Sequence, residues 1–204
     1  MRIRSWVAVI AGLLLSANLW AAMPILKGVG GDFSLQSSLG RQVNLTDFRG
    51  KVVLIFFGYT NCADICPTTM AHMSQLMDRL QPADRSRVQV LFVSIDSDND
   101  TATHLNQYLA YFDPSFIGLV DSQDKIDAVA AKYHTEYVKL ADSTVTTVYK
   151  KLTLAGEATD QQGYLFSHTA KIYVMDISGR VRGYFYMGTP HAEMQSQIEQ
   201  LLQE

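Results

Sequence analysis

The chain has 204 residues, of which 48% are hydrophobic and 18% are charged, as expected for one globular domain of ordinary size with a short additional segment. Its net charge is −3 and its pI is near 5.9. Because Lys and Arg form no cluster or stripe with interleaved aromatic residues, the sequence argues against a nucleic-acid partner.

The first 22 residues resemble an export signal. Residues 1–4 are a basic segment, residues 6–15 are a short apolar run, and the small residues Ala21 and Ala22 follow. The alternative is an uncleaved membrane anchor, because residues 6–22 reach the short limit for crossing a bilayer. Cleavage is the favoured interpretation. Either one predicts that residues 23–204 form a domain in the periplasm or at the outer face of the inner membrane.

The chain then enters a lead-in of two short predicted strands at 33–35 and 43–45, with turns at 38–41 and 48–51. The next segment, residues 52–57, is a continuous apolar run rich in β-branched residues. Such a run predicts a strand that is buried on both faces.

The only two cysteines, Cys62 and Cys66, follow this strand. Pro67 then opens a stretch with apolar residues at helical spacing that predicts a helix to about Leu80, since proline is tolerated in a first helical turn. The cysteines are therefore expected in a strand-to-helix connection near the positive end of a helix dipole. That position favours thiolates, which attack disulfides and bind soft metals. The alternative is two structural cysteines, either buried or joined in a small disulfide.

The rest of the chain alternates between the two kinds of element. The predicted elements are a strand at 88–95, a helix from Thr101, a strand at 116–120, a helix at 124–133, a hairpin of strands 171–176 and 181–186 turning at Gly179, and a helix at 190–204. The pattern loosens at 138–163, where residues 144–154 could form an extended segment. The alternation predicts an α/β fold with a largely parallel sheet.

A strand that ends at a cysteine pair and a helix, followed by further α/β units, a hairpin and a helix, is the plan of the thioredoxin fold. The fold class predicted here is therefore α/β and thioredoxin-like. It carries an N-terminal extension and an insertion before the strand that bears His168. Fold alone does not establish function.

Three kinds of chemistry could use the cysteine pair. Thioredoxin-like enzymes exchange dithiols and disulfides with two residues between the cysteines, whereas this chain has three. A peroxide-reducing thiol would need one activated cysteine. A soft-metal site would take two thiolates from this turn, and an added imidazole would suit Cu(I) or Cu(II).

The third ligand would have to come from one of five histidines: His72, His104, His134, His168 and His191. His72 and His104 fall in amphipathic helices, His134 ends a helix, and His191 starts one without a motif around it. His168 differs, because it directly precedes a predicted strand, and in a thioredoxin fold the loop entering that strand faces the cysteine turn. A lone histidine is also often structural.

Residues 50–67, GKVVLIFFGYTNCADICP, resemble the signature of the Sco/SenC family. Residues 93–96 with Asp100 and Thr101 are similar to its second motif, and residues 116–119 and 167–169 match further blocks in order. The resemblance covers roughly residues 30 to 200.

The resemblance implies a thioredoxin-fold copper protein that helps to assemble the copper A site of cytochrome c oxidase. Carried over, Cys62, Cys66 and His168 are the copper ligands. Implied partners are the copper A subunit, a thioredoxin-like reductant and another periplasmic copper chaperone. Asn61, Ala63 and Ser167 replace residues usual in the family, so they alter the groups that orient the ligands without removing a ligand.

Two hypotheses follow. The favoured one is an exported metallochaperone, not an enzyme, that holds one copper ion on Cys62, Cys66 and His168. The alternative is an exported thiol–disulfide oxidoreductase that uses the redox chemistry of Cys62 and Cys66 to reduce the oxidase subunit or another target. Asp64 and Asp96 also match acidic positions of the family, and their plain interpretation is a helix cap or a turn residue.

Overall fold

The computed structural model describes residues 23–140, 165–168 and 170–204. The N-terminal signal or anchor and the extended segment expected at 144–154 lie outside these residues. None of the helices in the described ranges is long and apolar enough to span a bilayer.

The strand that precedes the cysteines, β3 (Val52–Gly58), is buried along its whole length. It lies between β4 (Val88–Ser94) and β8 (Ile172–Met175) in a seven-stranded sheet. The order of the sheet is β2-β1-β5-β4-β3-β8-β9, where the remaining strands are β1 (Ser34–Ser37), β2 (Gln42–Asn44), β5 (Ile117–Val120) and β9 (Val181–Phe185). β6 (Tyr137–Leu140) and β7 (Leu165–His168) form a separate two-stranded sheet.

The sheet is mixed, so the prediction of a largely parallel sheet is wrong. β3 pairs in parallel only with β4, and β4 with β5, while the other four pairings are antiparallel. The pattern of apolar residues indicates which strands are buried, but it does not indicate in which direction they run. Here the tight β8–β9 hairpin makes one edge antiparallel, and the β1–β2 hairpin does the same at the other edge.

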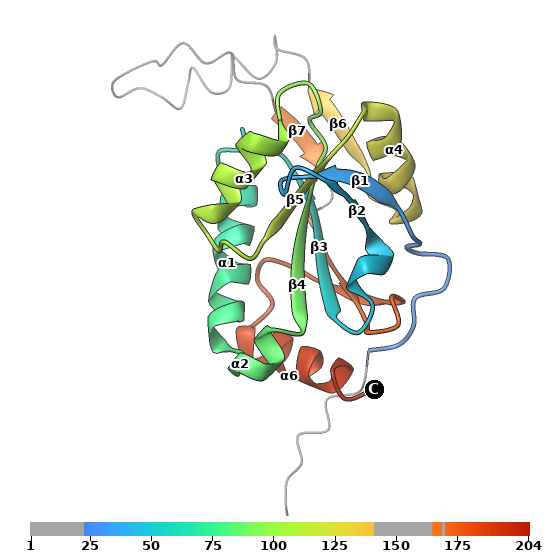
Figure 1. Cartoon of the computed structure of the whole chain (residues 1–204), viewed down its shortest axis with the longest axis vertical. Helices are drawn as coiled ribbons and strands as arrows, with labels where there is room; N and C mark the ends of the chain where they lie inside the picture. The colour runs from blue at the N-terminus through green and yellow to red at the C-terminus, as the bar shows by residue number, and fades with distance from the viewer. Residues whose placement is uncertain (1–22, 141–164, 169) are drawn as a thin grey trace, which may run out of the picture.

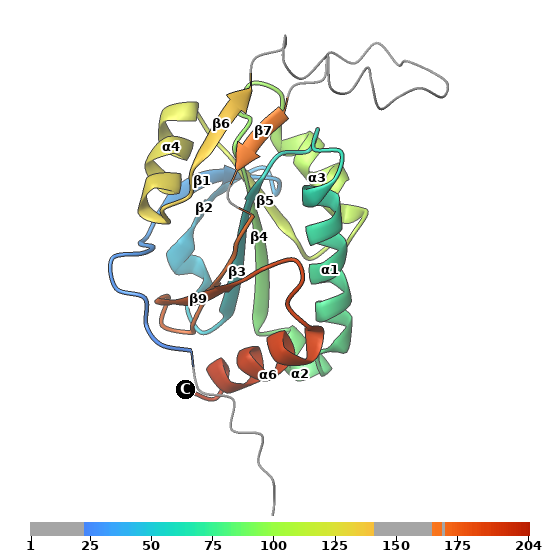
Figure 2. The same cartoon turned by 180° about the vertical axis from the view of Figure 1, so that it is seen from behind.

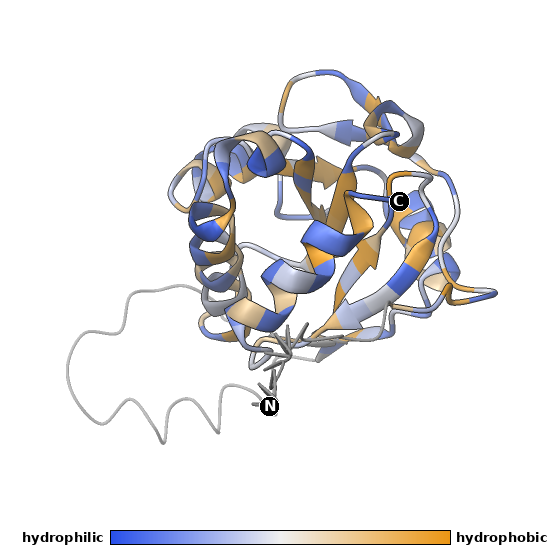
Figure 3. Ribbon diagram, turned by 90° about the horizontal axis from the view of Figure 1, so that it is seen from below, coloured by the Kyte–Doolittle hydropathy of each residue, from blue (hydrophilic) through white to orange (hydrophobic). Residues whose placement is uncertain are grey.

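Helices cover the sheet on two sides. They are α1 (Ile65–Arg79), α2 (Pro82–Arg85), α3 (Ala102–Ala110), α4 (Gln123–Lys132) and α6 (His191–Leu201), with a 3-10 turn η1 (Leu45–Phe48) after β2. Figures 1 and 2 show α1 and α4 on opposite sides of β3 and β4. This arrangement explains why β3 and β4 are apolar without alternation. Seen from below, apolar colour gathers on the strands, and polar colour is mixed along the surrounding helices (Figure 3).

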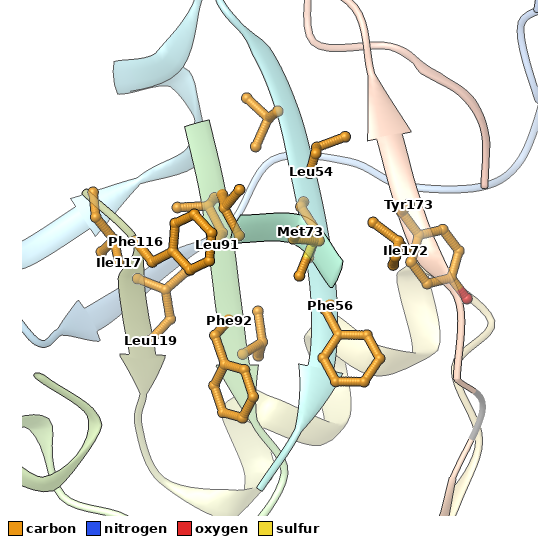
Figure 4. Packing of buried hydrophobic residues seen from close by; sticks show 14 of the residues in the cluster. Leu54, Phe56, Met73, Leu91, Phe92, Phe116, Ile117, Leu119, Ile172 and Tyr173 are labelled. Carbon is orange, nitrogen blue, oxygen red and sulfur yellow. The ribbon is translucent and has the colours of Figure 1, made fainter. Parts of the chain in front are cut away.

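Successive side chains of a strand point to opposite faces of the sheet, so β3 contributes to the core on both faces. Phe56 pairs in register with Phe92, and the centroids of the two rings lie 6.1 Å apart (Figure 4). The next residue, Phe57, contacts Tyr133 and Tyr173 instead. β3 therefore sends successive side chains to opposite faces of the sheet.

Two boundaries near the cysteines differ from prediction. α1 begins at Ile65 and not at Pro67, so Cys66 lies in the first helical turn and only Cys62 lies in the connection. Proline fits anywhere in that turn, because the first N–H groups of a helix have no intrahelical acceptor. His168 ends strand β7 and does not lie in a loop, because its backbone pairs with Tyr137 of β6.

Candidate metal and thiol site

The two cysteines differ in exposure. Cys66 is fully buried, whereas Cys62 is partly exposed between the exposed residues Asn61 and Ala63. The backbone N–H of Cys66 donates a hydrogen bond to Cys62 Sγ over 3.5 Å. The N-terminal end of α1 therefore acts on Cys62, which is the sulfur that solvent and partners can reach.

A hydrogen bond to Cys62 raises the pKa of the Cys66 thiol, and burial and the charge of Cys62 raise it further. The buried Cys66 thiol is therefore harder to deprotonate than an ordinary cysteine thiol. No disulfide joins Cys62 and Cys66 in the structure.

Gly58 makes room for Cys66. A Cβ atom at this position would lie 3.0 Å from Cys66 Sγ, 2.8 Å from Cε1 of Phe56 and 3.0 Å from Cε2 of Phe92. Gly58 was not among the site residues predicted from the sequence, although a glycine inside a strand pattern indicates close approach of another group.

A buried carboxylate holds the turn before Cys62. Asp100 accepts hydrogen bonds from the Thr60 backbone N–H at 3.1 Å, from the Thr60 hydroxyl and from Ser94 Oγ at 2.5 Å. His104 Nδ1 lies 3.8 Å from the same carboxylate. Asp100 thus ties the cysteine turn to the end of β4.

Asp64 and Asp96, the acidic residues that match positions of the family, lie at a helix start and in a turn. Asp64 occupies the N-cap position of α1 without a side-chain hydrogen bond to the helix. Asp96 follows β4, accepts hydrogen bonds from Asn99 at 3.0 and 3.1 Å, and lies 3.9 Å from Lys139 Nζ of β6. Asp96 is thus a buried turn residue that also faces the β6–β7 pair.

Tyr59 connects the cysteine turn with β7. Its hydroxyl accepts a hydrogen bond of 3.2 Å from the Phe166 N–H, and the two rings pack edge to face with centroids 5.0 Å apart. Burial raises the pKa of Tyr59, the Phe166 N–H lowers it, and the nearby Cys62 and Cys66 raise it further. The tyrosine therefore lies between the cysteines and the strand that ends at His168.

The structure therefore brings Cys62 and Cys66 together and places the backbone of His168 on a strand that contacts the same turn. The side chain of His168 lies outside what the structure describes. Among the described side chains, no group of three His, Cys, Asp or Glu is placed to hold a metal ion. The set of three ligands stays a prediction.

Of the other histidines, His104 lies beside Asp100, and His72, His134 and His191 have different surroundings. The rings of His72 and His191 stack with centroids 4.0 Å apart, and each Nε2 lies 3.0 Å from a backbone carbonyl oxygen, of Thr189 and of His72 respectively. His134 follows α4 with a φ of 50°. Sequence reasoning missed the stacked pair, because its members are far apart in the chain.

Comparison with known proteins identifies the family of this chain. A model of the SCO1/SenC family matches residues 23–203. An SCO2-like protein of Rickettsia conorii is 30% identical over 168 residues, which are 81% of this chain and 73% of that protein. Bradyrhizobium japonicum ScoI, solved with copper bound, is 30% identical with a TM-score of 0.70, and the match covers 85% of this chain and 99% of that one.

A more distant structure shares the fold. BsSco, described as a member of the Sco family of cytochrome c oxidase assembly proteins, is 22% identical with a TM-score of 0.63. The match covers 88% of this chain and 96% of BsSco. The mixed sheet and its helices are thus the thioredoxin-like fold of these proteins, which confirms the predicted fold class.

Proposed function

This chain belongs to the SCO1/SenC family, and from that premise we propose that it is an exported copper-binding metallochaperone that delivers copper to the copper A site of cytochrome c oxidase. Two similarities support the proposal. A relative with 30% identity is solved with copper bound, and BsSco is described as a member of a family of cytochrome c oxidase assembly proteins.

The contact between Tyr59 and Phe166 is the observation that supports Cys62, Cys66 and His168 as one copper site. It sets β7, which ends at His168, against the turn that bears Cys62 and Cys66. Two thiolates and one imidazole are a donor set that suits Cu(I). Copper is the cargo in this proposal, so a site that releases it is needed.

The exposure of Cys62 suits release. Its neighbours Asn61, Ala63 and Asp64 are exposed, so a thiolate of a partner can approach the copper from this side. Buried Cys66 would hold the ion while Cys62 is exchanged. The proposed acceptor is the copper A subunit, and another periplasmic copper chaperone is a second proposed partner.

The test is a Cu(I) competition titration of the reduced protein. We expect one tight equivalent in the wild type. In Cys62→Ser and in His168→Ala, we expect affinity to fall by more than about 100-fold, beyond the usual cost of losing a group that merely orients a ligand.

Circular dichroism and thermal unfolding of the same variants provide the control, because ligand loss should leave the apo fold intact. Unchanged stoichiometry and affinity in His168→Ala would show that this histidine is not a ligand.

A second candidate function is thiol–disulfide exchange, favoured by the hydrogen bond between the two cysteines. The exposed Cys62 thiolate would attack a disulfide of the target, and Cys66 would then displace the target's second thiolate by closing the Cys62–Cys66 disulfide. The target gains two thiols, and a thioredoxin-like protein would reduce the pair again. This activity would persist in His168→Ala, which separates it from copper delivery.

A further inference from the structure

The β6–β7 pair has little support from the main sheet. It belongs to a separate sheet of two strands, and two strands alone are marginally stable in water. In the described part of the chain, contacts that include a side chain join it to the rest of the domain.

The described side chains of β6 make several of these contacts. Tyr137 bonds through its hydroxyl to Asp127 and to Gln123, at 2.6 Å for Gln123, and Lys139 lies 3.3 Å from Asp98. These partners belong to α4 or to the turn after β4. They act on the strand that pairs with the His168-bearing strand.

β7 is held to the cysteine turn through Phe166. Lys139 lies over the Phe166 ring at 5.8 Å and Tyr137 lies beside it, but both are β6 residues. Tyr59 is different, because it comes from the chain between β3 and Cys62. Its side chain is 1% exposed, and its hydroxyl accepts the Phe166 backbone N–H. That bond fixes backbone and not only a side chain.

We propose that Tyr59 is a positioning residue that fixes β7 against the cysteine turn, so that His168 is already placed for a metal held by Cys62 and Cys66. This inference rests on the proposed copper function. His168 follows Phe166 by two residues, so its backbone lies about 7 Å further along the strand. A strand fixed at Phe166 leaves His168 little freedom to lose on binding, which is how preorganisation raises affinity.

The test compares Tyr59→Phe with Tyr173→Phe. Tyr173 is also buried, at 2% exposure, and its hydroxyl makes a hydrogen bond of 3.0 Å with Thr135, which belongs neither to β7 nor to the cysteine turn. Both variants lose one buried hydroxyl, so unfolding by denaturant should show similar losses of stability. Only Tyr59→Phe should speed hydrogen exchange of the Phe166 amide, by at least about tenfold, in the protein without metal.

Copper affinity then tests the link to His168. We expect Tyr59→Phe to lower Cu(I) affinity by about 10-fold, as for other residues that orient ligands, and Tyr173→Phe to leave it unchanged. In a His168→Ala background, Tyr59→Phe should have no further effect, because the histidine it positions is gone.

Three results would overturn the inference: unchanged exchange at Phe166, an equal affinity loss in Tyr173→Phe, or a full Tyr59→Phe effect without His168. The last would show that Tyr59 acts through Cys62. If the wild type binds no copper, the proposed function fails, whereas accelerated exchange at Phe166 in Tyr59→Phe would still establish the contact that fixes β7.

Discussion

At the scale of single residues, the cysteine site depends on the absence of a side chain. Gly58 leaves space that Cys66 Sγ and the rings of Phe56 and Phe92 enter. Its backbone has no positive φ, so the glycine is needed for space and not for conformation. Buried Cys66 can lie under the turn only because β3 ends in a residue without Cβ.

Gly58→Ala should therefore destabilise the domain by about 1–3 kcal/mol, the usual cost of an added methyl group in a packed core. Urea unfolding measures this change. Gly188→Ala is the matched control, because a Cβ there would meet no atom within 4 Å. If the two variants unfold with equal free energy, the side chains around Cys66 can accommodate the added methyl group without loss of stability.

The residues found by sequence reasoning are those with a local signal. The cysteine pair was visible as the only two cysteines beside an apolar strand, whereas His168 was singled out by its place before a strand and by family resemblance. The bond between Tyr59 and Phe166 joins residues 107 positions apart, so no spacing or periodicity could predict it. The network of Asp100 was missed for a similar reason, since Thr60 lies 40 residues away.

At the scale of elements, α1 and α6 meet through the stacked rings of His72 and His191. Burial lowers the pKa of His72, and the neighbouring His191 lowers it further, against the opposing effect of the Thr189 carbonyl. Protonation of His72 therefore works against this contact between the helices.

The direction of the pH effect follows from that lowered pKa. The unfolded chain binds a proton at His72 more readily than the folded one, so stability is full above the unfolded pKa of about 6.5 and falls as the pH drops below it. Urea unfolding at pH 7.5 and pH 5 should show a smaller loss of stability in His72→Gln than in the wild type.

His134→Asn is a suitable control for this experiment. His134 is exposed, and asparagine tolerates its left-handed backbone conformation. If His72→Gln loses as much stability at pH 5 as the wild type does, the stacked pair is not the source of the effect.

The periodicity of the sequence predicted the type of each element better than it predicted which strands pair. β3, β4, α4 and the β8–β9 hairpin lie close to their predicted ranges, because apolar runs and a Gly179 turn with φ of 79° are local features. The β6–β7 pairing was not predicted. Its strands are separated by residues 141–164, so the partner of each lies far along the chain.

At the scale of the whole molecule, Arg182 joins distant parts of the described chain. Its guanidinium bonds to the Met23 carbonyl at 2.8 and 2.5 Å, to Asp176 at 3.2 Å and to Glu204. Burial alone would raise the pKa of Asp176, but hydrogen bonds from Arg180 and Arg182 lower it. The stabilisation from Asp176 is therefore present above the ordinary pKa of about 4 and is lost as the pH falls through the lowered value.

Arg182→Met should destabilise the domain by about 3 kcal/mol, because it removes a buried partner of a buried carboxylate. Arg180→Met is the matched control. Arg180 bonds to the same carboxylate at 2.7 Å, but its side chain is 48% exposed, so its loss should cost less than about 1 kcal/mol. Equal losses in thermal unfolding would mean that the burial of Arg182 contributes nothing.

The position of Glu204, which bonds to Arg182, suits attachment of the domain to a solid support at this residue. Glu204 and α6 lie at one end of the molecule, and the β6–β7 pair with the cysteine turn lies toward the other (Figures 1 and 2). A tether at Glu204 would leave Cys62 facing the bulk solution, where an electrode-bound or resin-bound sample could still meet a soluble protein. The bond between Glu204 and Arg182 would hold the tethered end to the domain.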